Sequence, residues 1–180
     1  MSALLRTRGL PSDSEMLGLG TAHFLYRDRH FRTEAIKVLP GEYYATASEL
    51  MIVTLLGSCV AACIFDPVAR VGGMNHFLLP GNPDRDGSDQ SRRYGVFLME
   101  KLLNGLFERG ALRSRLQVKL FGGARVLDAR SDAGAKNAEF VLEHRKTTAI
   151  NDDGDRCTGA GLFENVFIRP QLRIGEKISF

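Results

Sequence analysis

Two apolar runs joined by an Asp-Pro turn constrain the fold of this chain more than any other feature. The first run is CVAACIF at residues 59–65, and the second is VGGMNHFLL at residues 71–79, with DPVAR between them. Pro67 presets the backbone angle of the first central position of a β-turn. The pattern therefore predicts a buried antiparallel hairpin.

The register of this hairpin decides which side chains meet. A four-residue turn at 66–69 would place Phe65 opposite Arg70 and, further along the ladder, Cys59 opposite His76. Opposed residues in an antiparallel pair have Cβ atoms about 4.5–5.5 Å apart on the same face. A shift of one residue would send the two side chains to opposite faces. The sequence thus predicts a thiol beside an imidazole.

The rest of the chain has the pattern of an α+β protein, a single-domain α/β sandwich with mixed or antiparallel sheets and two main helices. The helices are expected at 94–110 and 134–147, the first with Ser91 as N-cap and Gly110 as C-cap. Strands are expected within 35–46 on both sides of a Pro40-Gly41 turn, and at 49–57, 116–123, 147–152, 161–170 and 172–180.

Length and charge narrow the class of protein. A chain of 180 residues is enough for one domain with a core, and we divide it into a partly flexible N-terminal extension, 1–34, and a folded domain, 35–180. The net charge of +3 comes from interspersed charges, which is poor support for nucleic-acid binding. No apolar run has the length of a membrane span, and we see no signal peptide. We expect a cytoplasmic protein.

The cysteine count argues against a disulfide framework and against zinc. There are three cysteines, Cys59, Cys63 and Cys157, and an odd number without a secretory signal favours free thiols. Cys59 and Cys63 would need two further ligands at short spacing to hold zinc, and nothing beside Cys157 supplies them. No metal site is predicted.

The predicted pairing of Cys59 with His76 suggests a nucleophile and its base. A free thiol has a pKa near 8.5, so a neighbouring imidazolium would stabilise the reactive thiolate and later protonate a leaving amine. The Ser58 hydroxyl and the Cys59 N–H are candidates to hold an oxyanion, and Gly57 allows an unusual backbone angle in the turn that presents them. Thr54 is the local candidate to orient the imidazole. The alternative is ordinary packing, because free cysteines are among the most buried residues and Thr suits strands.

The stretch TLLGSCVAACIFDP…GGMNHFLLP resembles the signature of the chemoreceptor glutamine deamidases, the CheD family. KLFGGARVL at 119–127 and GAKNAEFVLE at 134–143 resemble further segments of that family, and the resemblance covers about residues 35–170. It implies a sandwich related to deamidating bacterial toxins. It also implies a Cys-His-Thr triad on Cys59, His76 and Thr54, although some relatives carry the Thr one residue earlier, where this chain has Val53.

The resemblance further implies hydrolysis of glutamine side chains on methyl-accepting chemotaxis receptors, and in some bacteria a partner phosphatase, CheC. Thioester chemistry of this kind needs no metal or organic cofactor. Receptor contact is expected near the polar loop 80–93. The competing hypotheses are a non-catalytic binding module for a CheC-like phosphatase or a receptor, a different thiol enzyme such as a transglutaminase, and a weak nucleic-acid binder.

Overall fold

The computed structural model describes residues 20–77, 88–123, 151–152 and 164–168. Nine strands and two helical segments lie in these ranges. In chain order they are β1 Phe24–Asp28, β2 Thr33–Lys37, β3 Tyr43–Thr46, β4 Met51–Leu56, β5 Val60–Asp66, β6 Val71–Asn75, the helix α2 Ser88–Phe107, a 3-10 helix at Arg113–Arg115, β7 Gln117–Gly122, β8 Asn151–Asp152 and β9 Glu164–Ile168.

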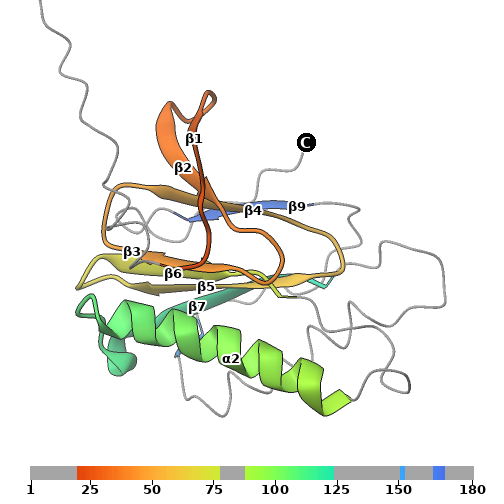
Figure 1. The fold of residues 1–180 in the computed structure, drawn as a ribbon. Coiled ribbons are helices and arrows are strands. Elements are labelled where there is room, and N and C mark those ends of the chain that lie inside the picture. Colours follow the sequence, from red (N-terminus) through yellow and green to blue (C-terminus); the bar gives the residue numbers. More distant parts are fainter. Residues whose placement is uncertain (1–19, 78–87, 124–150, 153–163, 169–180) are drawn as a thin grey trace, which may run out of the picture.

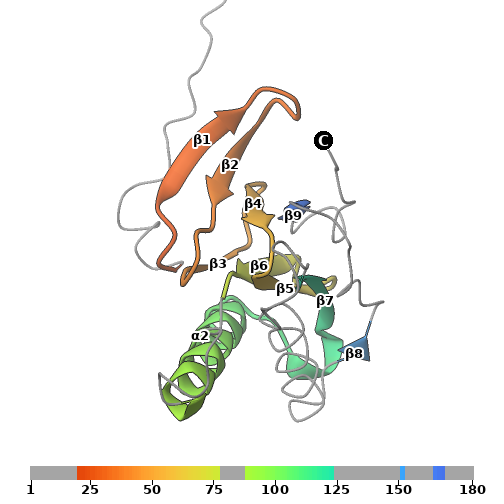
Figure 2. The same ribbon diagram turned by 90° about the vertical axis from the view of Figure 1, so that its right-hand side faces the viewer.

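The strands form two stacked sheets, and α2 packs on the outer face of one of them (Figure 1). One sheet has the order β1-β2-β4-β9, and the other has the order β3-β6-β5-β7-β8. The β2–β4 and β7–β8 pairs are parallel and the others are antiparallel. Figure 2 shows the resulting three layers end on. The prediction of an α+β fold with mixed and antiparallel sheets is confirmed.

Two apolar clusters hold these layers together. One lies between α2 and the sheet beneath it, and it includes Leu98, Leu102 and Leu106 from successive turns of the helix. The other fills the space between the two sheets, where Ile36 and Ile52 meet Met74. The central strand β5 is buried along its whole length because it supplies side chains to both clusters.

The predicted helix at 94–110 is present but begins earlier. It starts at Ser88, so Ser91 lies inside the helix and its prediction as the N-cap was wrong. The C-cap prediction is confirmed. Gly110 has φ +89°, and the N–H groups of Gly110 and Ala111 donate to the carbonyls of Phe107 and Leu106, the pattern of a Schellman motif.

Most predicted strands fall where the sequence placed them. The strands on both sides of Pro40-Gly41 are β2 and β3, 49–57 holds β4, 116–123 holds β7, and 161–170 holds β9. The second predicted helix, 134–147, and the strand 172–180 lie outside the described residues. The β1–β2 hairpin runs across the proposed division at residue 35, which stays a prediction. No helix among the described residues is long and apolar enough to cross a bilayer.

The register predicted for the β5–β6 hairpin was wrong by two residues. Phe65 pairs with Gly72 and Asp66 with Val71, so the turn occupies 67–70. Asp66 closes the ladder because its Oδ1 accepts from the N–H groups of Val68 and Ala69, at 2.9 and 3.0 Å. A shift of two preserves the face of every side chain.

Cys59 and His76 are therefore still on one face, as predicted. An isolated bridge between Val60 and Phe77 continues the same register beyond β6. In that register His76 falls opposite Ala61, so Cys59 is its diagonal neighbour and not its direct partner. The backbones of diagonal neighbours on paired strands lie about 7–8 Å apart, which is within reach of a long side chain.

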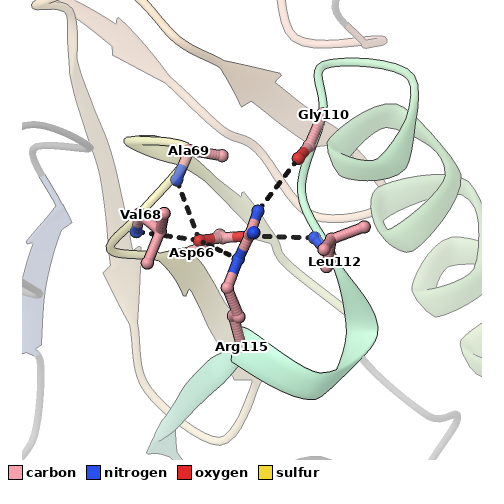
Figure 3. A network of polar contacts seen from close by, with 6 residues as sticks. All are labelled: Asp66, Val68, Ala69, Gly110, Leu112 and Arg115. Atoms are coloured by element: carbon pink, nitrogen blue, oxygen red, sulfur yellow. Dashed lines mark hydrogen bonds and ion pairs between the residues drawn. The ribbon is translucent and has the colours of Figure 1, made fainter.

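Asp66 also anchors the connection between α2 and β7 (Figure 3). Its fully buried carboxylate is 2.8 Å from Arg115 Nη2 and accepts from Arg115 Nε and from the N–H of Leu112. Burial by itself would raise the pKa of Asp66, but the Arg115 hydrogen bond and the three N–H donors lower it to about 2. The carboxylate thus joins the β5–β6 turn to the connection between α2 and β7.

We predict that Asp66→Asn lowers the free energy of unfolding by about 3 kcal/mol, because it leaves Arg115 without its buried counter-charge. Asp28→Asn is the matched control. The Asp28 carboxylate also accepts from the second and third N–H groups after it, but in an exposed turn. Urea unfolding of both variants measures the difference, and equal losses would contradict the argument.

The pH dependence of stability follows from the same pKa. Since the pKa of Asp66 is lower in the native state than its ordinary 3.8, its contribution is present above that pH and is lost as the pH falls toward 2.

Candidate active site

A pocket of about 370 Å³ opens between the two sheets, at the ends of β2 and β4. All five residues proposed from the sequence line it: Thr54, Gly57, Ser58, Cys59 and His76. The remaining lining residues come from the segment that leaves β2 and from the end of β4: Lys37, Val38, Leu39, Pro40 and Leu55. The fold thus brings the predicted site together in one cavity.

The imidazole of His76 is held by a side chain from the other sheet. Thr54, on β4, lies with its Oγ1 2.8 Å from His76 Nδ1, and both residues are buried. The same Thr54 hydroxyl donates to the carbonyl oxygen of Val38 at 2.7 Å. His76 Nε2 is buried and has no hydrogen-bond partner in the structure. Thr54, and not Val53, is therefore the residue that contacts the imidazole.

The main chain of His76 is fixed by the turn between β2 and β3. Its N–H donates to the carbonyl of Glu42 at 3.0 Å, and its carbonyl accepts from the N–H of Gly41 at 2.7 Å. The side chain of Asn75, the residue before His76, points to the opposite face of the sheet, toward α2. Its Oδ1 accepts from the N–H of Ala62, and its Nδ2 lies 3.9 Å from the sulfur of Met99 on α2.

Cys59 lies on the short connection between β4 and β5, where the end of β7 and the glycine pair Gly122-Gly123 approach it. Its carbonyl accepts from the N–H of Gly123 at 2.9 Å. Gly122 has φ +102°, and a Cβ placed on it would lie 2.1 Å from the Cys59 carbonyl oxygen. The sequence pattern identifies this glycine pair only as part of the KLFGGARVL motif. Its position shows that it makes room for the backbone of Cys59.

We predict that Gly122→Ala disturbs the site and not only the fold, because the new methyl group would displace the Cys59 carbonyl. Gly110→Ala is the matched control, since Gly110 also has a positive φ but has no atom within 4 Å of an added Cβ. Both variants should lose about 1–2 kcal/mol of stability from the backbone angle. Only Gly122→Ala should also lose about tenfold in activity per folded molecule. Equal activity in the two variants would contradict this role.

Burial sets the charge of the two candidate catalytic groups. It lowers the pKa of His76 to about 4, against a smaller opposing effect of the Val38 carbonyl. It raises the pKa of the Cys59 thiol, which the main-chain N–H of Cys59 offsets only in part. Both shifts favour the neutral forms. At pH 7 the resting site holds a thiol beside a neutral imidazole, which differs from the thiolate–imidazolium pair expected from the sequence.

Cys63 does not line this pocket. Cys63 is fully buried between the sheets, and burial raises the pKa of its thiol well above the ordinary value. Cys157 lies outside the described residues. Among the residues that the structure describes, no group of three or more His, Cys, Asp or Glu side chains is placed to hold a metal ion.

The family model and the similar proteins that match this chain all carry the same family name. Residues 78–160 match the family model CheD, described as CheD chemotactic sensory transduction. A probable chemoreceptor glutamine deamidase CheD 1 of Dechloromonas aromatica is 54% identical over 127 residues, which cover 69% of this chain and 63% of that protein. The protein with the same description from Shewanella oneidensis is 52% identical over 129 residues, covering 69% and 63%.

A third relative shows how far the similarity extends along the chain. The probable chemoreceptor glutamine deamidase CheD 1 of Burkholderia thailandensis is 48% identical over 148 residues, covering 77% of this chain and 63% of that protein. A continuous span of that size contains Thr54, Cys59 and His76 wherever it begins. The alignments span about six tenths of the length of these curated relatives. The comparisons confirm the resemblance that the sequence motifs indicated.

Proposed function

Because the chain is a relative of the CheD family, we propose that it deamidates selected glutamine side chains of methyl-accepting chemotaxis receptors. The product would be glutamate, with release of ammonia. One observation carries the proposal: Cys59, His76 and Thr54, from three separate segments, line one pocket, with Thr54 hydrogen-bonded to the imidazole. The relatives are described as probable chemoreceptor glutamine deamidases, which supports the choice of substrate.

In the proposed first step, Cys59 Sγ attacks the carbon of the glutamine carboxamide while His76 takes the thiol proton. The oxyanion is stabilised by the N–H of Cys59 and the hydroxyl of Ser58, with Gly57 shaping the turn. His76 then gives the proton to the amide nitrogen, the C–N bond breaks and ammonia departs. A thioester remains on Cys59. A neutral imidazole suits this sequence because it can accept the first proton.

In the second step, water adds to the thioester carbon as His76 takes one of its protons. The C–S bond breaks, the proton passes to the Cys59 sulfur, and the glutamate side chain is released. The thiol and the neutral imidazole are restored, so the cycle closes without a metal or an organic cofactor in its chemistry.

Receptor contact is proposed at the mouth of this pocket. Leu39 and Leu55 line it and are 39% and 43% exposed, so each presents apolar surface to an incoming helix. Lys37 adds a positive charge beside them. The contact predicted near 80–93 falls mainly on residues 80–87, outside the described ranges, and it stays a prediction.

The proposal extends to location and partners. In the reaction that the family resemblance implies, the modified domains of the receptors are cytoplasmic. We therefore propose a cytoplasmic location for this protein. A CheC-like phosphatase is proposed as a partner on the same resemblance. Pull-down of such a phosphatase by the full chain tests the second point separately from catalysis.

The deciding experiment is incubation of the full chain with receptor cytoplasmic fragments, read by high-resolution peptide mass spectrometry. Hydrolysis replaces the amide NH2 of glutamine by OH and releases ammonia. A transglutaminase would instead replace the amide NH2 by an amine, which adds the mass of the amine less that of the ammonia released. We expect conversion at a few glutamines in the wild-type reaction. The absence of both a mass change and released ammonia in the wild-type reaction would overturn the proposed activity.

A further inference from the structure

The direction of one buried hydrogen bond fixes the proton on His76. A threonine hydroxyl carries a single hydrogen and can donate only one hydrogen bond. Thr54 donates that hydrogen to the carbonyl oxygen of Val38, 2.7 Å away. Towards His76 Nδ1, at 2.8 Å, the hydroxyl can therefore only accept. The hydrogen of a neutral imidazole must then be on Nδ1.

The Val38 carbonyl enforces this direction because it has no hydrogen to give. A hydroxyl or a water in its place could donate to Thr54 and so reverse both hydrogen bonds. Thr54 would then donate to Nδ1, and the imidazole would carry its hydrogen on Nε2. The backbone of Val38 is held on both sides of its Cα atom: its N–H donates to the carbonyl of Val53 at 2.8 Å, and the N–H of Leu39, in the same peptide group as the Val38 carbonyl, donates to Glu42 Oε2. Val38 is fully buried. The acceptor is thus rigid and shielded from water.

The far nitrogen of the ring completes the picture. His76 Nε2 is buried and has no hydrogen-bond partner in the structure. This agrees with a nitrogen that carries no hydrogen and is left to accept a proton from another group. The low pKa of His76, about 4, keeps the ring neutral at pH 7, so that only one of its nitrogens carries hydrogen.

We propose that the main-chain carbonyl of Val38 is a positioning group of this site. It takes the Thr54 hydrogen and thereby holds His76 as the Nδ1–H tautomer, which leaves Nε2 as the nitrogen that can accept a proton. Its effect on catalysis rests on the proposed deamidase function, whereas the tautomer itself does not. The relay runs from β6 through β4 to the end of β2, and it thereby links His76 to the segment that forms the pocket wall.

The tautomer is measured directly by long-range ¹H–¹⁵N NMR correlations of the histidine rings in the full chain at pH 7, with His76→Gln to assign the signal. We expect the Nδ1–H form in the wild type and in Thr54→Ser, which keeps the hydroxyl. Thr54→Val should show a mixture of tautomers and a kcat about 10- to 100-fold lower, with KM unchanged. An Nε2–H wild type, or a Thr54→Val protein with unaltered tautomer and kcat, would overturn the proposal.

The carbonyl itself is tested by replacing Leu39 with the matching α-hydroxy acid, which turns the Val38–Leu39 amide into an ester and weakens the Val38 carbonyl as an acceptor. This change also removes the Leu39 N–H, which donates to Glu42 Oε2 at 2.9 Å. Glu42→Ala is therefore the control, because it removes that hydrogen bond and leaves the carbonyl an amide. We expect the ester alone to move His76 toward the Nε2–H form. Identical tautomers in the two proteins would refute the role of Val38.

The two proposals fail separately. The NMR experiment needs no substrate, so the predicted tautomer without any glutamine hydrolysis would count against the deamidase function alone. Hydrolysis by a protein with the opposite tautomer would count against the relay alone.

Discussion

Cys59→Ala is expected to lower glutamine deamidation by at least about 10⁴-fold while leaving the fold intact. The variant loses the sulfur that would form the thioester, and no other group in the pocket lining can replace it as a nucleophile of that strength. Cys59 is only partly buried, so truncation to Ala leaves a small void at the pocket surface and not in the core. The measurement is conversion of receptor glutamines by peptide mass, alongside urea unfolding.

Cys63→Ala provides the control for this prediction. Cys63 is on the same face of β5 but fully buried, so its loss should cost some stability and leave the activity per folded molecule unchanged. Equal activity of Cys59→Ala and wild type would remove Cys59 from the mechanism. If Cys59→Ala also kept its effect on chemotaxis in cells, the chain would be better explained as a binding module.

The hairpin that carries the site could be predicted from the sequence because its signals are local. Two apolar runs and an Asp-Pro turn were enough to place β5 and β6. The register was not predictable from turn residues alone, because Asp66 is fixed by Arg115, which lies 49 residues away. The prediction for Cys59 and His76 survived because the error was an even number of residues.

The groups that position the site were harder to foresee. A main-chain carbonyl such as that of Val38 leaves no mark in a sequence, since every residue has one. The parallel pairing of β2 with β4 brings it to Thr54, and that pairing is not visible in a single sequence. Gly122 and Gly123 did leave a signal, a glycine pair after a strand, but not the information that Cys59 would be the neighbour that requires them.

The neutral state of Cys59 and His76 at pH 7 could likewise be inferred only with the structure. From the sequence, a thiol beside an imidazole suggests an ion pair, because each charge would stabilise the other. In the folded chain, His76 is almost completely buried between two sheets, and the desolvation of its charged form outweighs this effect. In the proposed reaction, the neutral His76 would therefore be able to accept a proton at pH 7, and the Cys59 thiolate would form only as its proton is transferred.

His76→Gln is expected to lower deamidation by about 10³-fold, since the variant has no group that can accept the Cys59 proton and return it to the leaving nitrogen. In the wild type the loss of activity on acidification should follow the native pKa of His76. Protonation removes the base, so the rate should stay level from pH 7 to about 5 and fall only as the pH approaches 4. A decline centred near the ordinary histidine value of 6.5 would contradict a buried base.

The same residue should make the native state sensitive to acid. Between the ordinary pKa of 6.5 and the native value of about 4, the unfolded chain binds a proton at residue 76 and the folded chain does not. Stability therefore falls as the pH drops through this window, by about 3 kcal/mol in all. His76→Gln removes this dependence but keeps the exposed His23 and His30, so urea midpoints at pH 7, 5.5 and 4.5 should converge in the variant and spread in the wild type.

This window lies above that of Asp66, whose contribution is lost only below its ordinary pKa of 3.8, so the two acid effects are separable. Parallel pH profiles for wild type and His76→Gln would show that the imidazole is not buried neutral.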